Sequence, residues 1–351
     1  MADLARLAGV SVSTVSRALA GSPLVGREKR EQILRIAQEH GYVVNSTARN
    51  LRLRRTQAIS VVIPLGHEAE QPLTDPFFVT MLGHLADEVT QRGYGMFLQK
   101  ILPASSGWLR EFIDSGRSDG VIVIGQSTEH AALEEAARRQ APLVVWGGRL
   151  ARQSYCTVGT DNVAGGRLAT EHLLSTGRRR IVFLGDPTGP EIALRHAGYV
   201  DDVRAGPKGT AAPQVVPAHL TADAAYDSMR RLLARGAGFD AVFAASDVIA
   251  MSALRALREA GRAVPDDVAV VGFDDLALAA HASPPLTTVR QDVARGARLL
   301  VAKLFARLAG EDATSEFLVP ELVVRESSGV RPAVAARPAP AAARRRGPAS
   351  S

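Results

Sequence analysis

The spacing of apolar residues divides the chain at about residue 56. Before that point, short runs repeat apolar residues at helical intervals, whereas from Thr56 onwards apolar runs alternate with amphipathic segments. Runs that are apolar throughout are typical of parallel strands covered on both faces, and their alternation with helices predicts an α/β fold. Ligands of such sheets bind beyond the carboxyl ends of the strands. A cleft between two sheets would therefore be lined by strand-end residues of both.

The patterns after residue 56 fall into two consecutive series. The first predicts strands at AISVVIPL, GMFLQ, GVIVIG and PLVVWG, with helices at about 77–91 and 131–139. The second begins after TVGTDN and predicts strands at RIVFLGD, AVFAAS and VAVVGFDD, with helices through AGGRLATEHLLSTG, about 193–203, DAAYDSMRRLLARG and VIAMSALRALREAG. Two series of this kind predict two similar lobes.

The first 19 residues contain two short helical patterns separated by Ala-Gly-Val-Ser. Their apolar faces are formed by Leu4, Ala5 and Ala8 in the first and by Val15, Ala18 and Leu19 in the second. Gly9 tolerates the positive φ that a sharp reversal requires, and the hydroxyl of Ser11 can cap the second helix. This pattern is typical of a helix-turn-helix, whose second helix lies in the DNA major groove. A pair of helices that merely pack together is the alternative.

The segment LVGREKREQILRIAQEHGY predicts a third helix. Its inward face is expected to contain Ile33, Leu34, Ile36 and Ala37, because these positions recur at helical intervals. Gly41 supplies the stop at its C-terminal end.

The Arg-rich segment NSTARNLRLRRT follows the third helix. Asn45 can cap a short helix that runs through Leu51 and Arg52. A helix of this length is marginal in water, so it should form only when another molecule holds it. Two interpretations stay open: an ordinary linker, or a hinge helix in the DNA minor groove with Leu51 as a wedge between base steps.

Basic residues concentrate at the two ends of the chain. Residues 1–55 contain ten Lys or Arg and four Asp or Glu, and residues 331–351 contain five Arg and no acid. Residues 56–330 carry a net charge of −5. A basic N-terminal module on a mildly acidic body is typical of a protein that binds nucleic acid through the module alone.

The composition excludes several classes of protein. The single cysteine, Cys156, rules out an internal disulfide and a cysteine-based zinc site. The chain has no N-terminal apolar region of the secretory type and no apolar run of about 18 residues. We therefore expect a cytoplasmic protein that uses no membrane, metal or cofactor. The 46% hydrophobic content suffices for a large core in two or three domains.

Several motifs, in this order, resemble the lactose-repressor/galactose-repressor (LacI/GalR) family of bacterial transcription regulators. They are DLARLAGVSVSTVSRALAG, GYVVNSTARNLR, DPFF, DNVAGGRLATEHLLSTGRRRIVFLG, ALRHAGY, SDVIAMSAL, VGFDD and PPLTTVRQD. Each motif is weak alone, but their order and spacing from Met1 to about Val330 are specific.

The resemblance implies an all-α helix-turn-helix headpiece and an α/β core of two Rossmann-like lobes with parallel sheets, like periplasmic binding proteins. The expected domains are a headpiece at 1–44, a hinge at 45–55, a core at 56–330 and a disordered basic tail at 331–351. Within the core, the first lobe should contain about 56–159 and 286–315, and the second about 160–285 and 316–330. The implied function is regulation of transcription, with repression favoured, by a homodimer on operator DNA whose affinity a small molecule controls.

The residues that match the family's DNA-contacting positions lie in the second helix and the hinge. They are Ser11, Val12, Ser13, Thr14, Ser16 and Arg17, together with Asn45, Ala48, Arg49, Leu51 and Arg52. Arg17 can donate two hydrogen bonds to guanine, whereas Ser13 is shorter and less selective.

The residues expected at the effector site either follow a strand or, as with Arg195, Ser246 and Asp274, match positions that lie at or near the ligand in the family. They are Asp75, Phe77, Phe78, Trp146, Arg195, Ser246 and Asp274. Carboxylates and an arginine can bond several hydroxyls, and aromatic rings can pack on a flat apolar face. A sugar or glycoside is therefore the expected effector, with a purine as the alternative. Trp146 is equally compatible with a core tryptophan, and Asp161 is expected to cap a helix.

The sequence also departs from the family and leaves other classes to weigh. Met1 stands where several residues, including a capping threonine, usually precede the first helix, and Ser246 and Ser252 replace a frequent Asn and Gly.

A periplasmic sugar-binding protein would share the lobes but not the headpiece. A Rossmann enzyme or a hydrolase would need a glycine-rich fingerprint or a nucleophile motif, and we find neither. The tail lacks leucine heptads, so a dimer is expected rather than a tetramer held by a coiled coil.

Overall fold

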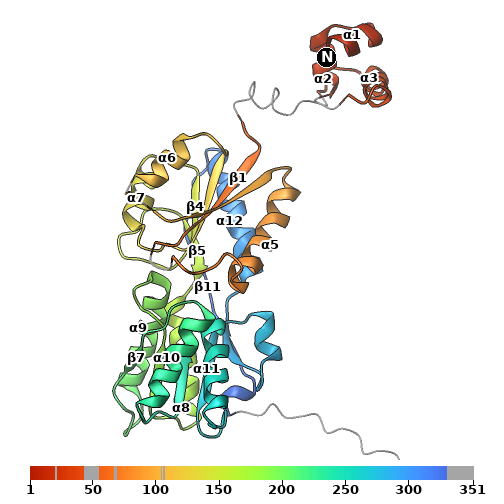
Figure 1. The fold of residues 1–351 in the computed structure, drawn as a ribbon. Coiled ribbons are helices and arrows are strands. Elements are labelled where there is room, and N and C mark those ends of the chain that lie inside the picture. Colours follow the sequence, from red (N-terminus) through yellow and green to blue (C-terminus); the bar gives the residue numbers. More distant parts are fainter. Residues whose placement is uncertain (20–21, 43–54, 67–68, 104, 106, 330–351) are drawn as a thin grey trace, which may run out of the picture. The chain divides into compact units, whose positions relative to one another are not determined.

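The computed structural model describes residues 1–19, 22–42, 55–66, 69–103, 105 and 107–329 (Figure 1). The chain separates into two compact units, Met1–Thr56 and Gln57–Ser351. Each unit has its own hydrophobic core.

The N-terminal unit is built of three helices, α1 (Ala2–Ala8), α2 (Val12–Leu19) and α3 (Arg27–Glu39). Gly9 adopts the left-handed conformation, with φ of 63°, so the reversal after α1 occurs where the sequence predicts it. The core shared by the three helices contains Leu4, Ala5, Ala8, Val15, Ala18, Val25, Ile33 and Ala37. One prediction was wrong, because Leu34 is 45% exposed. Ile33 and Ala37 lie one turn apart on the buried face, and Leu34, about 100° further round the helix, points away from it.

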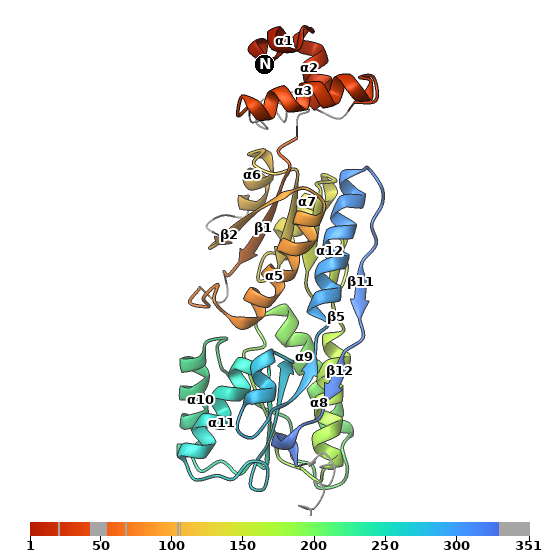
Figure 2. The ribbon, with the colours of Figure 1, turned by 90° about the vertical axis from the view of Figure 1, so that its right-hand side faces the viewer.

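The larger unit contains two six-stranded sheets, one in each lobe (Figures 1 and 2). The first has the order β11-β5-β4-β3-β1-β2 and contains β1 (Ala58–Pro64), β2 (Gly95–Ile101), β3 (Gly120–Ile124), β4 (Leu143–Trp146), β5 (Thr157–Thr160) and β11 (Glu316–Leu318). The second has the order β12-β10-β9-β8-β6-β7 and contains β6 (Ile181–Leu184), β7 (Gln214–Val216), β8 (Ala241–Ala244), β9 (Ala269–Asp274), β10 (Thr287–Arg290) and β12 (Glu321–Val323). All pairings are parallel except that of β10 with β12.

Helices cover both faces of each sheet, which is why the central strands are apolar throughout. In the first lobe, α5 (Pro76–Gln91) and α12 (Val293–Leu308) pack on one face, and α6 (Trp108–Asp114) and α7 (His130–Arg138) pack on the other. The second lobe carries α8 (Asn162–Ser175), α9 (Pro190–Ala205), α10 (Ala222–Ala234) and α11 (Asp247–Glu259), with short 3₁₀ turns η1 (Ala277–His281) and η2 (Glu326–Ser328). Asp161 caps α8 by accepting a hydrogen bond from Ala164 N at 3.0 Å, as predicted.

The chain passes between the lobes three times, and two predicted boundaries were wrong. Thr287–Arg290 belongs to the second sheet, where it pairs with β9 and β12, and Glu316–Leu318 belongs to the first, where it pairs with β5. The hydroxyl of Thr288 holds β10 in the second lobe by donating to Asp247 at 2.5 Å. A strand of three or four residues has too little periodicity to reveal its sheet from sequence.

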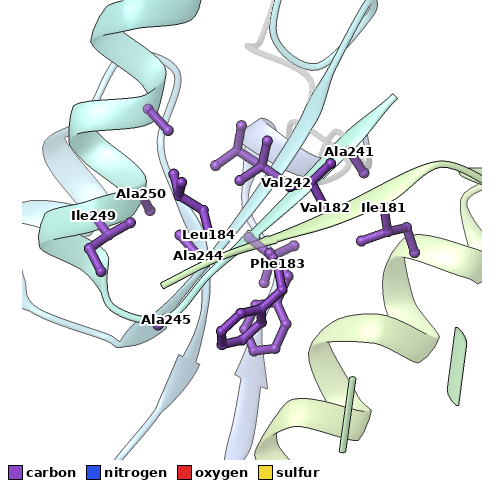
Figure 3. Packing of buried hydrophobic residues seen from close by; sticks show 14 of the residues in the cluster. Ile181, Val182, Phe183, Leu184, Ala241, Val242, Ala244, Ala245, Ile249 and Ala250 are labelled. Atoms are coloured by element: carbon purple, nitrogen blue, oxygen red, sulfur yellow. The ribbon is translucent and has the colours of Figure 1, made fainter. Parts of the chain in front are cut away.

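The core of the second lobe joins the central strands to the helices around them. Figure 3 shows the β6 residues Ile181 to Leu184 beside residues of β8 and the start of α11. Phe183 contacts Phe243 edge to face, with ring centroids 5.3 Å apart. The fully buried Tyr199 of α9 packs on Phe183 and donates its hydroxyl to the carbonyl of Ile181 at 2.8 Å. These contacts fix α9 against strand β6.

Helices α8 and α9 approach so closely that only glycine fits at two positions between them. A Cβ at Gly166 would lie 2.1 Å from the carbonyl oxygen of Arg195, and one at Gly198 would lie 2.2 Å from that of Val163. Because both obstructing atoms belong to the backbone, a side chain at either position would have to separate the helices. The two glycines therefore set the position of α9.

Replacing Gly198 by alanine is expected to lower the free energy of unfolding by about 1–3 kcal/mol, because the extra methyl group overpacks the helix pair. Denaturant titration of the variant measures this. Gly83→Ala on the exposed face of α5 is the control, since no atom lies within 4 Å of its Cβ position. It should raise stability by about 0.5–1 kcal/mol through the better helix propensity of alanine. Equal effects of the two substitutions would contradict the close approach.

Candidate functional site

The exposed face of α2 presents most of the side chains predicted to contact DNA. Val12, Ser13 and Arg17 are exposed, whereas Thr14 and Ser16 are half-buried. Val15 and Ala18 of the same helix are buried against α1 and α3. The hydroxyl of Ser11 accepts a hydrogen bond from Thr14 N at 3.1 Å, so it caps the helix as predicted.

Arg17 extends from α2 without forming an ion pair to any carboxylate in the described part of the chain. By contrast, Arg6 pairs with Asp3 and Arg27 pairs with Glu31. The guanidinium of Arg30 is used inside the unit, where it donates to the carbonyl of Ser22 at 2.7 Å. Asn45, Ala48, Arg49, Leu51 and Arg52, predicted for the hinge, lie outside the described residues, as does the tail 331–351.

A cavity of about 740 Å³, counting the space open to solvent, lies between the two lobes of the larger unit. The carboxyl ends of strands from both sheets and the first turns of three helices line it. All seven residues predicted for the effector site share this cavity: Asp75, Phe77, Phe78, Trp146, Arg195, Ser246 and Asp274. Sequence reasoning missed the polar side chains of Gln71, Glu191 and Gln291, which also line it.

The first lobe contributes an aromatic wall to the cavity. Phe77 lies 5.9 Å from Phe78 and 6.2 Å from Trp146, measured between ring centroids. Trp146 is only 4% exposed and packs so closely on α12 that a Cβ at Gly296 would lie 2.3 Å from its ring. The tryptophan is thus both a core residue and part of the cavity wall.

Asp75 stands beside this wall and caps α5. Its carboxylate accepts hydrogen bonds from Phe77 N at 2.9 Å and from Gln71 Nε2 at 3.1 Å. Burial raises the pKa of Asp75, and these hydrogen bonds oppose that rise. The aspartate of the DPFF motif is therefore also the cap of α5.

The second lobe contributes a buried guanidinium. Arg195 of α9 donates from Nε to Asn162 Oδ1 at 2.8 Å and from a terminal nitrogen to the carbonyl of Ala245 at 2.5 Å. Its planar group lies 3.8 Å from the centroid of the Phe273 ring. Burial lowers the pKa of Arg195, and the nearby carboxylates, Asp274 first, oppose that change.

Asp274 faces Arg195 from the end of β9. One carboxylate oxygen lies 3.9 Å from the arginine nitrogen and accepts a hydrogen bond from Gln291 Nε2 at 2.7 Å. The residue has φ of 121°, a conformation that L-residues rarely adopt and that the surrounding structure must enforce. Burial raises the pKa of Asp274 to about 7, with Arg195 opposing the rise.

The start of α11 completes this side of the cavity. Ser246 caps the helix by accepting from Ile249 N at 3.3 Å. The next residue, Asp247, is fully buried and accepts hydrogen bonds from Leu276 N at 2.8 Å and from Thr288. Burial raises the pKa of Asp247. Asp247 therefore joins the start of α11 to Leu276 and to β10, and it does not line the cavity.

A hydrogen bond joins the two lobes next to the cavity lining. The backbone N–H of Gln126, after β3, donates to Glu191 Oε1 in the first turn of α9 at 3.1 Å. Gln126 is itself fixed, because its side chain donates to Tyr155 Oη at 2.9 Å and accepts from Gly148 N at 2.9 Å. Gly148 in turn contacts the second lobe, since a Cβ there would lie 2.4 Å from Leu194. Glu191 thus lines the cavity and also forms a hydrogen bond between the lobes.

Neither a metal centre nor a membrane helix is found within the described ranges. No group of three or more His, Cys, Asp or Glu side chains there could hold a metal ion. None of the helices described is both long and apolar enough to cross a membrane.

Two family profiles match the chain in the order of its two units. Residues 1–45 match bacterial regulatory proteins of the lacI family, and residues 170–328 match a periplasmic binding protein-like domain. Among known proteins, the HTH-type transcriptional regulator CelR of Thermobifida fusca is 35% identical over 334 residues, covering 92% of this chain and 96% of CelR.

Solved structures agree with these sequence matches. A CelR–cellobiose complex has a TM-score of 0.68 and 34% identity, covering 92% of this chain and 98% of the other. A lac repressor dimer bound to operator and an anti-inducer has a TM-score of 0.79 at 23% identity, covering 93% and 98%, and shows the fold alone.

A helix-turn-helix unit followed by a two-lobed, periplasmic-binding-protein-like core defines a ligand-responsive transcription regulator. With these sequence matches, the chain belongs to the LacI family of bacterial transcriptional regulators.

Replacing Glu191 by alanine is expected to shift the larger unit towards more open lobes, because the hydrogen bond from Gln126 N loses its acceptor. Single-molecule energy transfer between a dye on each lobe measures the distribution. Glu191→Gln is the matched control, since its amide oxygen can still accept that hydrogen bond and should preserve the wild-type distribution. The same broadened distribution in both variants would show that the charge, not the hydrogen bond, holds the lobes.

Proposed function

We propose that the chain acts in the cytoplasm as a homodimeric repressor whose operator affinity is controlled by a sugar or glycoside in the interlobe cavity. The observation that carries this proposal is the cavity itself. It combines an aromatic wall from one lobe with an arginine and carboxylates from the other, and the seven residues expected from the sequence and its family resemblance all line it.

In the DNA-binding unit, Arg17 reads base edges and the neighbouring exposed residues of α2 position the helix in the major groove. Support comes from the exposure of Val12, Ser13 and Arg17 on a helix whose opposite face is buried. An arginine at this position can donate two hydrogen bonds to guanine. The hinge residues, with Leu51 as a minor-groove wedge, remain part of the proposal.

The homodimer uses the edge of the first sheet. Strand β2 ends the order of that sheet, and its Phe97 and Leu98 are 58% and 43% exposed. An exposed apolar edge strand favours pairing with another chain, and here we assign it to a second copy. Dimerisation would also place two headpieces on the two half-sites of a pseudo-palindromic operator.

The effector site favours a polyhydroxylated ring. Phe77, Phe78 and Trp146 supply flat faces for the C–H side of a sugar, and Asp75 and Asp274 supply acceptors for its hydroxyls. The complex of CelR with cellobiose supports this class, because CelR is a relative of this chain over nearly its whole length. A purine would also stack on the aromatic wall, but it would leave more of the carboxylates unpaired.

The control of DNA binding follows from linkage. If the sugar prefers one arrangement of the lobes and operator DNA prefers another, each ligand lowers the affinity for the other by the same factor. Couplings of this kind are typically about 1–3 kcal/mol.

Replacing Arg17 by alanine is expected to flatten the preference for one base pair by about 1–3 kcal/mol, because two hydrogen bonds to a base edge are lost. Binding-site selection followed by titration of operator variants measures this. Arg35→Ala, an exposed arginine of α3, is the control and should leave the relative preferences unchanged. An unaltered selected sequence with Arg17→Ala would refute the assignment.

Replacing Asp274 or Arg195 by alanine is expected to abolish sugar-induced operator release while preserving operator binding, because each leaves a buried polar partner unsatisfied. Calorimetry with cellobiose and a panel of sugars and nucleobases, together with operator release, provides the measurement. Glu311→Ala, an exposed carboxylate after α12, is the control. A full sugar response in either cavity variant would place the site elsewhere, and tight binding of a nucleobase but of no sugar would overturn the effector class.

A further inference from the structure

We propose that the cavity selects uncharged sugars and rejects sugars that carry a phosphate or carboxylate, with Glu191 as the residue that sets this selectivity. The inference rests on the proposed function and deepens it by naming the charge class of the effector.

The first observation is the balance of charge among the described residues that line the cavity. Three carboxyl groups, those of Asp75, Glu191 and Asp274, face one guanidinium, that of Arg195. If Asp274 carries a proton, two carboxylates still face one cation. An anionic ligand therefore meets a surplus of negative charge, whereas a neutral sugar meets acceptors for its hydroxyl groups.

The second observation is that Arg195 is already engaged. It donates to Asn162 and to the carbonyl of Ala245, and it faces Asp274 at 3.9 Å. It is 7% exposed and stacks on Phe273. A phosphate would have to displace these contacts, and the partners it left unsatisfied would offset part of its gain. The single cation of the described lining is thus not arranged as a free anion receptor.

The third observation concerns the N-terminus of α9, a 16-residue helix that begins at Pro190. Gly189, Glu191 and Ile192 all line the cavity, so this helix start lies at the cavity wall. Helix N-termini attract anions. Here the carboxylate of Glu191 occupies the first turn and offsets that attraction. Removing its charge would leave the attraction of the helix N-terminus for an anionic ligand unopposed.

Glu191 is the carboxylate best suited to a test. Asp75 caps α5, and Asp274 contacts Arg195 and Gln291, so substitution of either would change more than the charge of the cavity. Glu191 is half-buried, and Glu191→Gln retains an oxygen that can accept from Gln126 N. The variant therefore removes the charge while keeping the contact between the lobes.

The experiment is calorimetric titration of the full chain with cellobiose, glucose and ribose, each compared with its phosphate ester at neutral pH. For the wild type, at least one uncharged sugar should bind, and its phosphate ester should bind at least about tenfold more weakly, the size expected for one unfavourable charge contact. With Glu191→Gln, affinity for the ester should rise about fivefold or more. Affinity for the uncharged sugar should change by less than about threefold.

Glu311→Gln is the matched control, because Glu311 is exposed and lies outside the cavity lining. It should leave both affinities at wild-type values. A phosphate ester that binds the wild type as tightly as its parent sugar would overturn the charge selectivity but leave the sugar effector in place. An unchanged ratio in Glu191→Gln would overturn the role of Glu191. If no uncharged sugar binds at all, both this inference and the proposed effector class are wrong.

Discussion

The burial of one guanidinium governs the arrangement of the second lobe around the cavity. A charged group taken out of water must be paired and hydrogen-bonded, and Arg195 meets that requirement only where Asn162, the carbonyl of Ala245, Phe273 and Asp274 converge. These partners come from the starts of α8 and α11 and from β9. The positions of two helix starts and one strand end are therefore tied to a single side chain.

That arrangement depends in turn on the contact between α8 and α9. Gly166 lies against the carbonyl of Arg195 itself, and Gly198 lies one turn further along α9. The backbone approach that the two glycines permit brings Arg195 within reach of Asn162 at the start of α8. Tyr199, buried beside them, attaches the same helix to β6 through its hydroxyl. Packing of glycine against backbone thus determines where the charge of the cavity lies.

The sequence predicts most of this fold, because long apolar strands and amphipathic helices have strong periodicity. The cap at Asp161 and the turn at Gly9 follow from local signals. Of the seven residues that meet in the cavity, Arg195 and Ser246 follow from the resemblance to the family, and the others also follow a strand in the sequence. What the sequence does not predict is decided by long-range pairing. The short strands β10 and β11 carry no periodic signal that shows which sheet they join. Glu191 and Gln126 lie at helix and strand ends that look ordinary until the lobes come together.

The path of the chain has a consequence for how the protein is made. The first lobe contains α12 and β11, which follow the whole series from α8 to β10 in the sequence. During synthesis, α5 and the strands β1 to β5 therefore emerge long before the helix that packs against them. Val144, Trp146 and Val158 lack part of the packing on that face until residues 293–308 have left the ribosome. The second lobe reaches most of its core first, so it can fold while the lobe that precedes it in the chain still waits for its last helix.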